Sequence, residues 1–316
     1  MSTRALLAGL LLCTTGSMAF AASDTGEAVQ REQYANREIL PDPTAAACPD
    51  MPRTLTQVSG NLYRHTNAAL PALHSGLVLI TSEGALVIDP AMTCTTGWLR
   101  DEIKSRFNVG IKYVVYTHAH FDHIVGSQLL QDEGATVVAQ RNAVEDIVGE
   151  KLPVAVPDKV FDDKMTITLG GETVELYHVA PSHSNSMTVV LFPKYKALQC
   201  TDICQSGTLP YMDFLDFYYD GWVKTLDWVQ KQDVEYIDVG HYKPATKADQ
   251  QALRDYLVSL HDQILALVRA GNSWDQLWRK VKFTDEQKKW FGYDAMRFAN
   301  IEGMYRWVSN HRRGVW

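Results

Sequence analysis

The sequence predicts a mixed α/β (α+β) fold, and three patterns support that prediction. Short β-rich runs follow one another up to Asp89, strands and helices then alternate, and helical periodicity alone remains beyond Pro244. The chain has 316 residues, of which 46% are hydrophobic and 21% charged, so it is long enough to bury one large core.

The β-rich runs between Thr54 and Asp89 predict a meander of antiparallel strands. Turns at Ser59-Gly60 and Glu83-Gly84 separate its β-rich runs. The runs are Thr54 to Val58, Asn61 to Thr66, Gly76 to Thr81 and Ala85 to Asp89.

The middle part alternates between helical and extended patterns. A helix near Gly97 to Phe107 is followed by a strand at Tyr113 to Thr117 and a helix from about Ile124. The remaining elements are a strand at Thr136 to Ala139, a helix near Asn142 to Val148, strands at Met165 to Leu169, Thr173 to Val179, Met187 to Phe192 and Ala197 to Thr201, a helix at about Gly221 to Gln230, and a strand at Tyr236 to Val239.

Residues 246–316 predict a helical C-terminal extension. Apolar residues recur at three- and four-residue steps from Leu253 to Leu267, and Gly271 ends that helix. Ser273 and Thr284 are each followed three residues later by Gln, which predicts two further helix starts.

The N-terminal segment predicts export from the cytoplasm. Arg4 precedes the apolar run Ala5 to Leu12, and Ala19-Phe20-Ala21 fits a signal-peptidase site, so residues 1–21 are expected to be a cleaved signal peptide. The apolar run is shorter than the roughly 20 residues that span a bilayer, which argues against stable membrane insertion. Residues 22–53 are polar and proline-rich and predict an N-terminal extension of a periplasmic or secreted protein.

The net charge bears on possible binding partners, and the cysteine content bears on disulfide formation. The net charge of -7, without long Lys/Arg runs, argues against nucleic acid. Cleavage would leave Cys48, Cys94, Cys200 and Cys204 in a compartment where disulfides persist, and three pairings are open. Cys200 could also be a metal ligand, although a disulfide or packing role is favoured.

One short segment concentrates potential metal ligands. His118-Ala119-His120-Phe121-Asp122-His123 lies between a predicted strand and a predicted helix. His118 and His120 are two residues apart in extended chain and can share one cation, whereas the turn directs Asp122 and His123 toward a second position. Imidazole and carboxylate together suit Zn²⁺.

Further ligands are expected from later loops, because each catalytic zinc needs about three protein ligands. The candidates are His183, Asp202 and His241, and each of them follows a predicted strand.

This pattern resembles the metallo-β-lactamase-fold hydrolase superfamily over about Thr54 to Pro244. The resemblance implies two zinc ions per chain. The first would be held by His118, His120 and His183, the second by Asp122, His123 and His241, and Asp202 would bridge both.

The resemblance also implies an αββα sandwich of two mixed β-sheets with outer helices, so residues 54–245 are expected to form the catalytic domain. The N-terminal signal and the helical tail, including the stretch from Asn300 to Tyr305, look more like the glyoxalase-II-like and quinoprotein-relay-associated branches.

The implied activity is hydrolysis of a small-molecule substrate. Two zinc ions sharing a water lower its pKa from about 16 toward about 7, so that hydroxide, oriented by Asp122, can attack an ester, thioester, lactone or amide, including a β-lactam. Gln205 stands where a lactamase subclass has a substrate-gripping Lys, which weakens the β-lactam interpretation.

Candidate substrate-binding residues are His74, Asn185 and Lys243, together with the acidic aromatic stretch Tyr211 to Tyr219. In the resembling family a hairpin loop covers the metal cleft, and Asn67 to Ser75 is expected to be that flap, with His74 in it.

Two alternatives remain open at this point. One is a mononuclear-iron oxidoreductase similar to persulfide dioxygenases, which use two His and one Asp. The other is a non-catalytic metal-binding accessory of a periplasmic dehydrogenase system. The sequence leaves the oligomeric state and the substrate open.

Overall fold

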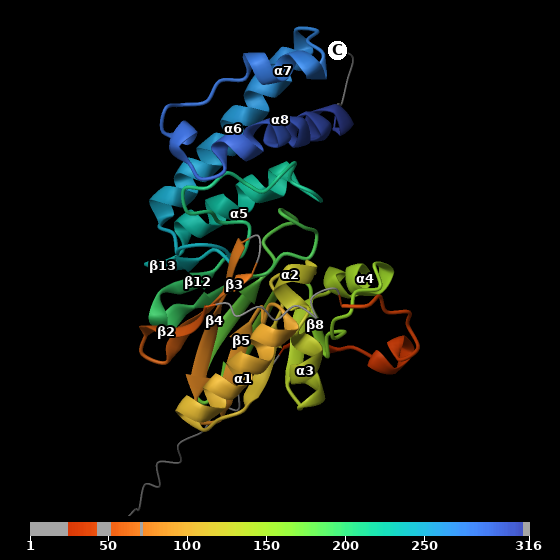
Figure 1. Ribbon diagram of the computed structural model, residues 1–316, viewed down its shortest axis with the longest axis vertical. Helices are drawn as coiled ribbons and strands as arrows, with labels where there is room; N and C mark the ends of the chain where they lie inside the picture. The colour runs from red at the N-terminus through yellow and green to blue at the C-terminus, as the bar shows by residue number, and fades with distance from the viewer. Residues whose placement is uncertain (1–24, 43–51, 70–71, 312–316) are drawn as a thin grey trace, which may run out of the picture.

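The computed structural model describes residues 25–42, 52–69 and 72–311, which form two stacked β-sheets with helices on both outer faces (Figure 1). The expected αββα sandwich is thereby confirmed. The predicted signal peptide and Cys48 lie outside the described residues.

The larger sheet has eight strands in the order β1-β8-β7-β6-β5-β4-β3-β2. Strands β2 to β5 pair antiparallel, as the meander predicted, and β5 to β8 are parallel. Its strands are β1 Glu27–Ala28, β2 Arg53–Ser59, β3 Leu62–Ala69, β4 Ala72–Thr81, β5 Gly84–Ile88, β6 Ile111–Val115, β7 Thr136–Gln140 and β8 Lys159–Phe161.

The smaller sheet has five strands in the order β13-β12-β11-β10-β9. All its pairs are antiparallel except β12 with β13. Its strands are β9 Lys164–Leu169, β10 Glu172–Tyr177, β11 Val189–Phe192, β12 Ala197–Gln199 and β13 Tyr236–Asp238.

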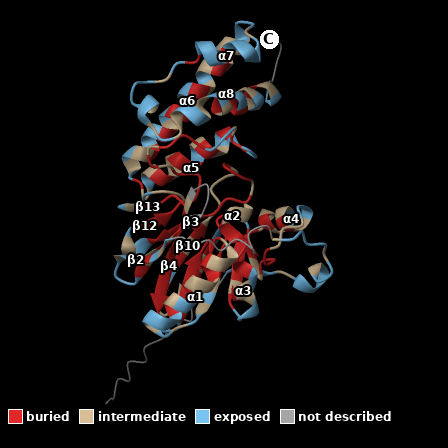
Figure 2. Ribbon diagram, viewed as in Figure 1, coloured by how far each residue is buried: buried red, intermediate tan, exposed pale blue. Residues whose placement is uncertain are grey.

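Buried residues lie mainly in the strands of the two stacked sheets (Figure 2), and their apolar side chains form a cluster shared by both sheets. Leu79 and Ile88 of the larger sheet belong to the same buried cluster as Ile167 and Leu176 of the smaller one. Alternating strand residues of the larger sheet face outward instead, where Val87 packs with Leu99 of α1.

The helices divide between the two faces. Helices α1 Thr93–Phe107, α2 Phe121–Ile124, α3 Ser127–Asp132 and α4 Asn142–Gly149 cover the larger sheet, and α5 Tyr219–Lys231 and α6 Lys247–Arg269 cover the smaller. Helices α7 Trp274–Lys280 and α8 Tyr293–Asn310 pack on α6 at one end of the molecule (Figure 1). The short 3₁₀ helices are η1 Arg31–Tyr34, η2 Pro193–Tyr195 and η3 Gln287–Lys289.

Helix α8 also holds the long loop between β12 and α5. The buried Asn300 donates its Nδ2 to the carbonyl oxygens of Pro210 and Met212, and its Oδ1 accepts a bond from the Tyr256 hydroxyl of α6. One buried amide thus makes hydrogen bonds to α6 and to two carbonyls of the loop, and these bonds tie the helical extension to the loop.

Several elements differ from the sequence-based expectation. The polar N-terminal extension contributes an edge strand, because Glu27 and Ala28 pair with β8. The helix expected from about Ile124 is two short helices, α2 and α3, divided at Gly126, where a Cβ would clash with Thr96. Thr284 precedes a single 3₁₀ turn rather than an α-helix, and α8 begins later, after Gly292.

The segment expected to form a flap also differs from the expectation of a loop, although its role as a flap over the metal cleft stays a prediction. Asn67 to Ser75 is not an open loop, because β3 and β4 pair in register as far as Ala69 and Ala72. His74 therefore lies within a strand. In the described part of the chain, no helix is both long and apolar enough to cross a membrane.

Candidate metal centre

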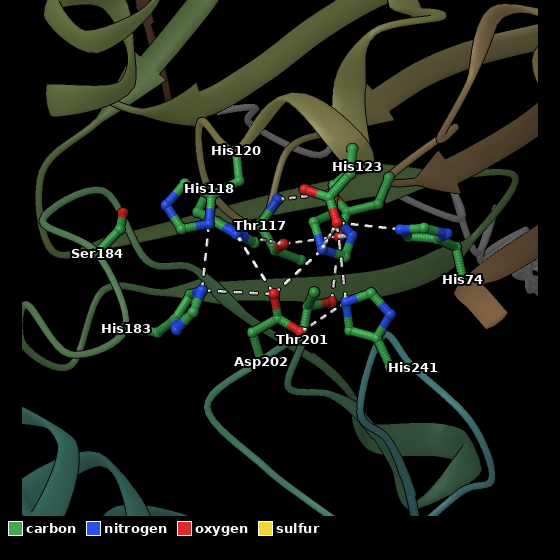
Figure 3. A network of polar contacts seen from close by, with 12 residues as sticks. His74, Thr117, His118, His120, His123, His183, Ser184, Thr201, Asp202 and His241 are labelled. Carbon is green, nitrogen blue, oxygen red and sulfur yellow. Dashed lines mark hydrogen bonds and ion pairs between the residues drawn. The ribbon is translucent and has the colours of Figure 1, made fainter. Parts of the chain in front are cut away.

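The predicted ligands meet at one edge of the sandwich, where strands from both sheets end. His118 and His120 follow β6, Asp202 follows β12 and His241 follows β13. Since β4 runs antiparallel to β5, the start of β4 with His74 reaches the same edge. Figure 3 shows the side chains pointing toward one another from these elements.

Four of the residues form the first donor group. The ligand atoms of His118, His120, His183 and Asp202 all lie within 4.8 Å of one another. His183 Nε2 is 3.1 Å from His120 Nδ1 and 3.5 Å from Asp202 Oδ2. These spacings suit donors around one ion, because two ligands about 2.1 Å from a metal lie roughly 3 to 3.5 Å apart.

The second donor group shares Asp202 with the first. His123 Nε2 lies 3.1 Å from Asp202 Oδ2, and His241 Nε2 lies 3.1 Å from Asp202 Oδ1. Asp122 Oδ2 is 3.5 Å from His123 Nε2 and 3.9 Å from His241 Nε2. The carboxylate of Asp202 thus stands between the two groups (Figure 3).

Hydrogen bonds on the far side of the rings direct imidazole lone pairs into the site. The Thr117 hydroxyl donates to Asp89 Oδ2 at 2.6 Å, so it accepts from His118 Nδ1 at 3.0 Å. The His118 Nε2 then carries a lone pair, and this buried atom has no hydrogen-bond partner among the described residues.

Two further rings are anchored in the same way. His241 Nδ1 donates to the Leu73 carbonyl at 3.2 Å, and His120 Nε2 faces Asp216 Oδ1 at 3.1 Å. In a neutral His241 ring the remaining Nε2 is an acceptor, as is its 3.1 Å neighbour Asp202 Oδ1, so a cation held between them would satisfy both atoms. The donor set therefore fits metal ions.

Burial and the pairing of imidazoles with carboxylates set the electrostatics of the cluster. Burial lowers the pKa of His118 well below its usual value and lowers the pKa of His183 to about 4. Burial acts on His123 in the same direction, but Asp122 and Asp202 outweigh it and raise its pKa to about 10. Although burial opposes ionisation of both carboxylates, neighbouring histidines hold their pKa values below the usual range. The site concentrates ionised carboxylates with imidazoles, the donors that a metal binds.

Asp89 is a supporting residue that sequence reasoning did not single out. It accepts bonds from Thr117 N at 2.9 Å and from Thr201 Oγ1 at 3.1 Å, and burial raises its pKa to about 6. It thus ties the residue before His118 to the residue before Asp202. Its position directly after a fully buried strand was the available signal.

Asp216 is the second residue that was not singled out. It lies within the Tyr211 to Tyr219 stretch, which was assigned to substrate, but its carboxylate faces His120 instead. The contact spans 96 residues of sequence, and no spacing pattern marks it. By contacting the ring nitrogen opposite the cluster, Asp216 orients His120.

The turn bearing Asp202 is braced on both sides. Cys200 and Cys204 form a disulfide around it, and Trp222 Nε1 donates to the Ile203 carbonyl at 2.7 Å. Asp202 itself has a left-handed backbone, with φ of 60°. The disulfide answers the open question about Cys200, which contacts Cys204 and not the donor groups.

The three residues predicted to bind substrate lie in three different places. His74 is 4% exposed and its Nε2 lies 3.0 Å from Asp122 Oδ2, so it belongs to the donor cluster. Asn185 lies beside α4, with its Nδ2 3.4 Å from Asp146 Oδ1. Lys243 is exposed. Roles for Asn185 and Lys243 in binding substrate stay predictions.

Comparison with known sequences identifies the family. The sequence profile described as the metallo-beta-lactamase superfamily matches residues 73–241, more than half of the chain. The chain belongs to this superfamily. Its match spans the ligand segment of 118–123 and ends at His241.

Curated members of the superfamily are distant in sequence. The "Metallo-beta-lactamase type 2" of Elizabethkingia meningoseptica is 26% identical over 191 residues, covering 57% of this chain and 72% of that protein. The "Linear primary-alkylsulfatase" of a Pseudomonas strain is 24% identical, covering 54% of this chain and 43% of its own length.

Solved structures support the fold. The "Metallo-beta-lactamase from Pontibacter korlensis" superposes with a TM-score of 0.61 at 22% identity, covering 66% of this chain and 99% of that one. The metallo-beta-lactamase "DIM-1" has a TM-score of 0.60 at 20% identity. Family membership and the His/Asp cluster together support a metal-dependent hydrolase.

Proposed function

We propose that this protein is a dizinc hydrolase that cleaves an ester, thioester, lactone or amide bond outside the cytoplasm. The observation that supports this most strongly is the position of Asp202 between two donor groups, 3.5 Å from His183 and 3.1 Å from both His123 and His241. Two zinc ions held there would supply a nucleophile from water at neutral pH and an electrophile for the substrate carbonyl.

The chain's own residues would orient that chemistry. The Asp122 side chain is half exposed, in contrast to the buried Asp202, so Asp122 would be the carboxylate on the solvent and substrate side of the site. His74 fixes one of its oxygens. Asp89 and Thr117 hold the His118 ring so that Nε2 faces inward.

We propose that residues around the opening of the site select the substrate. Gln205 is engaged internally, because its Nε2 donates to the Asp202 carbonyl at 3.3 Å and its Oε1 accepts from Thr208. It therefore does not replace the Lys that grips a substrate carboxylate in a lactamase subclass. Tyr211 and Leu215 are exposed on the loop that bears Asp216, and on this basis a substrate with an apolar part is proposed.

The relatives extend the range of substrates worth testing. Their names include metallo-beta-lactamases and a linear alkylsulfatase. A β-lactam and a sulfate ester with an alkyl chain therefore belong beside carboxylic esters, thioesters and lactones in the assay.

Location and partners are part of the same proposal. The signal-like segment 1–21 and the Cys200–Cys204 disulfide support an oxidising compartment. A small-molecule substrate is proposed, without nucleic acid, since the chain has an acidic net charge.

The deciding experiment combines elemental analysis with a hydrolysis screen of the purified protein. We expect two zinc ions per chain and turnover of at least one substrate class. His118→Ala should lose zinc from the first group, and Asp122→Asn should lower turnover at least about 100-fold. His311→Ala, at an exposed histidine on the distal end of α8, is the matched control and should behave as wild type. One iron ion per chain, or two zinc ions with no turnover, would favour the oxidoreductase or the accessory alternative.

A further inference from the structure

His74 has the surroundings of a ligand rather than of a core histidine. Its side chain is buried, its ring centroid lies 4.7 Å from that of His241 and 5.5 Å from that of His123, and its Nε2 is 3.0 Å from Asp122 Oδ2. Its ligand atom lies within 4.8 Å of those of Asp122 and His241. Figure 3 shows it facing the cluster from the side opposite His183.

Three imidazoles converge on one carboxylate oxygen. Asp122 Oδ2 is 3.0 Å from His74 Nε2, 3.5 Å from His123 Nε2 and 3.9 Å from His241 Nε2. A single carboxylate oxygen does not need three nitrogen neighbours for hydrogen bonding alone. Nitrogens that surround one oxygen in this way match ligands grouped around a common cation.

The backbone holds His74 in this position. His74 and His241 form an isolated antiparallel bridge, in which Ser75 N donates to the Gly240 carbonyl at 2.7 Å. The same segment anchors the His241 ring through the Leu73 carbonyl. The backbone pairing of β4 with the loop after β13 thus fixes the His74 and His241 rings relative to each other.

We propose that His74 is a protein ligand of the second metal position, together with Asp122, His123, His241 and the shared Asp202. This proposal rests on the proposed dimetal function. With five protein donors the second ion has fewer open positions than the first. The substrate would then bind mainly at the first ion, which His118, His120, His183 and Asp202 hold.

The alternative role for His74 is that of a hydrogen-bond donor to Asp122, and two variants separate the roles. His74→Gln keeps an N–H donor of similar reach, whereas His74→Phe keeps the ring volume and removes both nitrogens. His311→Gln is the matched control, because it removes an exposed histidine at the end of α8.

The decisive measurement is the proton spectrum of the protein loaded with two Co²⁺ ions. Each metal-bound imidazole contributes one strongly shifted, exchangeable N–H resonance. If His74 is a ligand, wild type and His311→Gln should show six such resonances and both His74 variants five. A wild type with five, unchanged in His74→Gln, would overturn the proposal.

Competition with a chelator supplies a second readout. Both His74 variants should bind the second metal equivalent at least about 10-fold more weakly, while the first equivalent stays as in wild type. Full affinity in His74→Gln would indicate a hydrogen-bond role and would contradict the proposal. Binding of fewer than two ions by wild type would instead contradict the dimetal function itself, so the two failures are distinguishable.

Discussion

The Nε2 of His120 lies 3.1 Å from the Asp216 carboxylate, which projects from the loop between β12 and α5. The contact raises the pKa of His120 against the opposing effect of burial, and it lowers that of Asp216. Helix α8 holds the same loop through Asn300. The C-terminal extension is therefore connected to the metal centre through this loop.

Removing the Asp216 carboxylate should weaken the first metal position. Asp216→Asn loses the charge that orients the His120 ring, and we expect metal affinity to fall about 10- to 100-fold. Chelator competition measures the change. Asp220→Asn, an exposed carboxylate at the start of α5, is the control and should leave the affinity unchanged.

Adding one methyl group at Gly303 should disturb the site from a distance. A Cβ there would lie 2.1 Å from the Asp213 carbonyl oxygen, so either α8 or the loop bearing Asp216 must move. Gly303→Ala should cost about 1 to 3 kcal/mol in urea unfolding and lower turnover.

Gly97→Ala is the matched control within another helix. A Cβ at Gly97 would lie 3.8 Å from Leu129, so this variant should be as stable as wild type or more stable by up to about 1 kcal/mol. If Gly303→Ala matches Gly97→Ala in stability and turnover, the connection between α8 and the site is wrong.

Opening the Cys200–Cys204 disulfide should loosen the Asp202 turn. The bridge closes a loop with a sequence separation of 4, for which chain entropy predicts a loss of about 2 kcal/mol in the double Ser variant. Because Asp202 serves both donor groups, both metal equivalents should bind more weakly. Retention of wild-type affinity for both would show that Trp222 and the backbone suffice to hold the turn.

His65 should make the protein sensitive to acid independently of the metal ligands. The ring is buried and donates Nε2–H to the Ile88 carbonyl at 3.1 Å, and burial lowers its pKa to about 4. Its unfolded pKa is about 6.5, so the unfolded state binds more protons between pH 6.5 and 4. The neutral His65 ring therefore makes its full contribution to the free energy of unfolding above pH 6.5, and this contribution is lost as the pH falls to 4.

The measurement is urea unfolding of wild type and His65→Gln across that range. Between pH 7 and pH 4, the free energy of unfolding of wild type should fall by about 3 kcal/mol more than that of the variant, since Gln can donate to Ile88 but does not titrate. Parallel pH profiles for the two proteins would contradict this assignment. The comparison cancels the other histidines, which both proteins share.

Local sequence patterns predicted most elements of the domain. Alternation and turn residues placed β2 to β5, and apolar periodicity placed α6, because each depends on neighbours within a few residues. The 3₁₀ turn after Thr284 shows the limit of this reasoning. A capping pattern marks a possible start, but burial against other elements decides whether a helix continues.

The sequence alone predicted a metal site with histidine and aspartate ligands, because the types of ligand, their order and the spacing of His118 to His123 are local properties. Only the tertiary structure decided that His74 joins them from a strand 48 residues before Asp122, and that Asp216 supports His120 from 96 residues away. Such contacts depend on which strand ends and loops share one edge of the sandwich. That arrangement follows from burial of the whole core, which no short stretch of residues encodes.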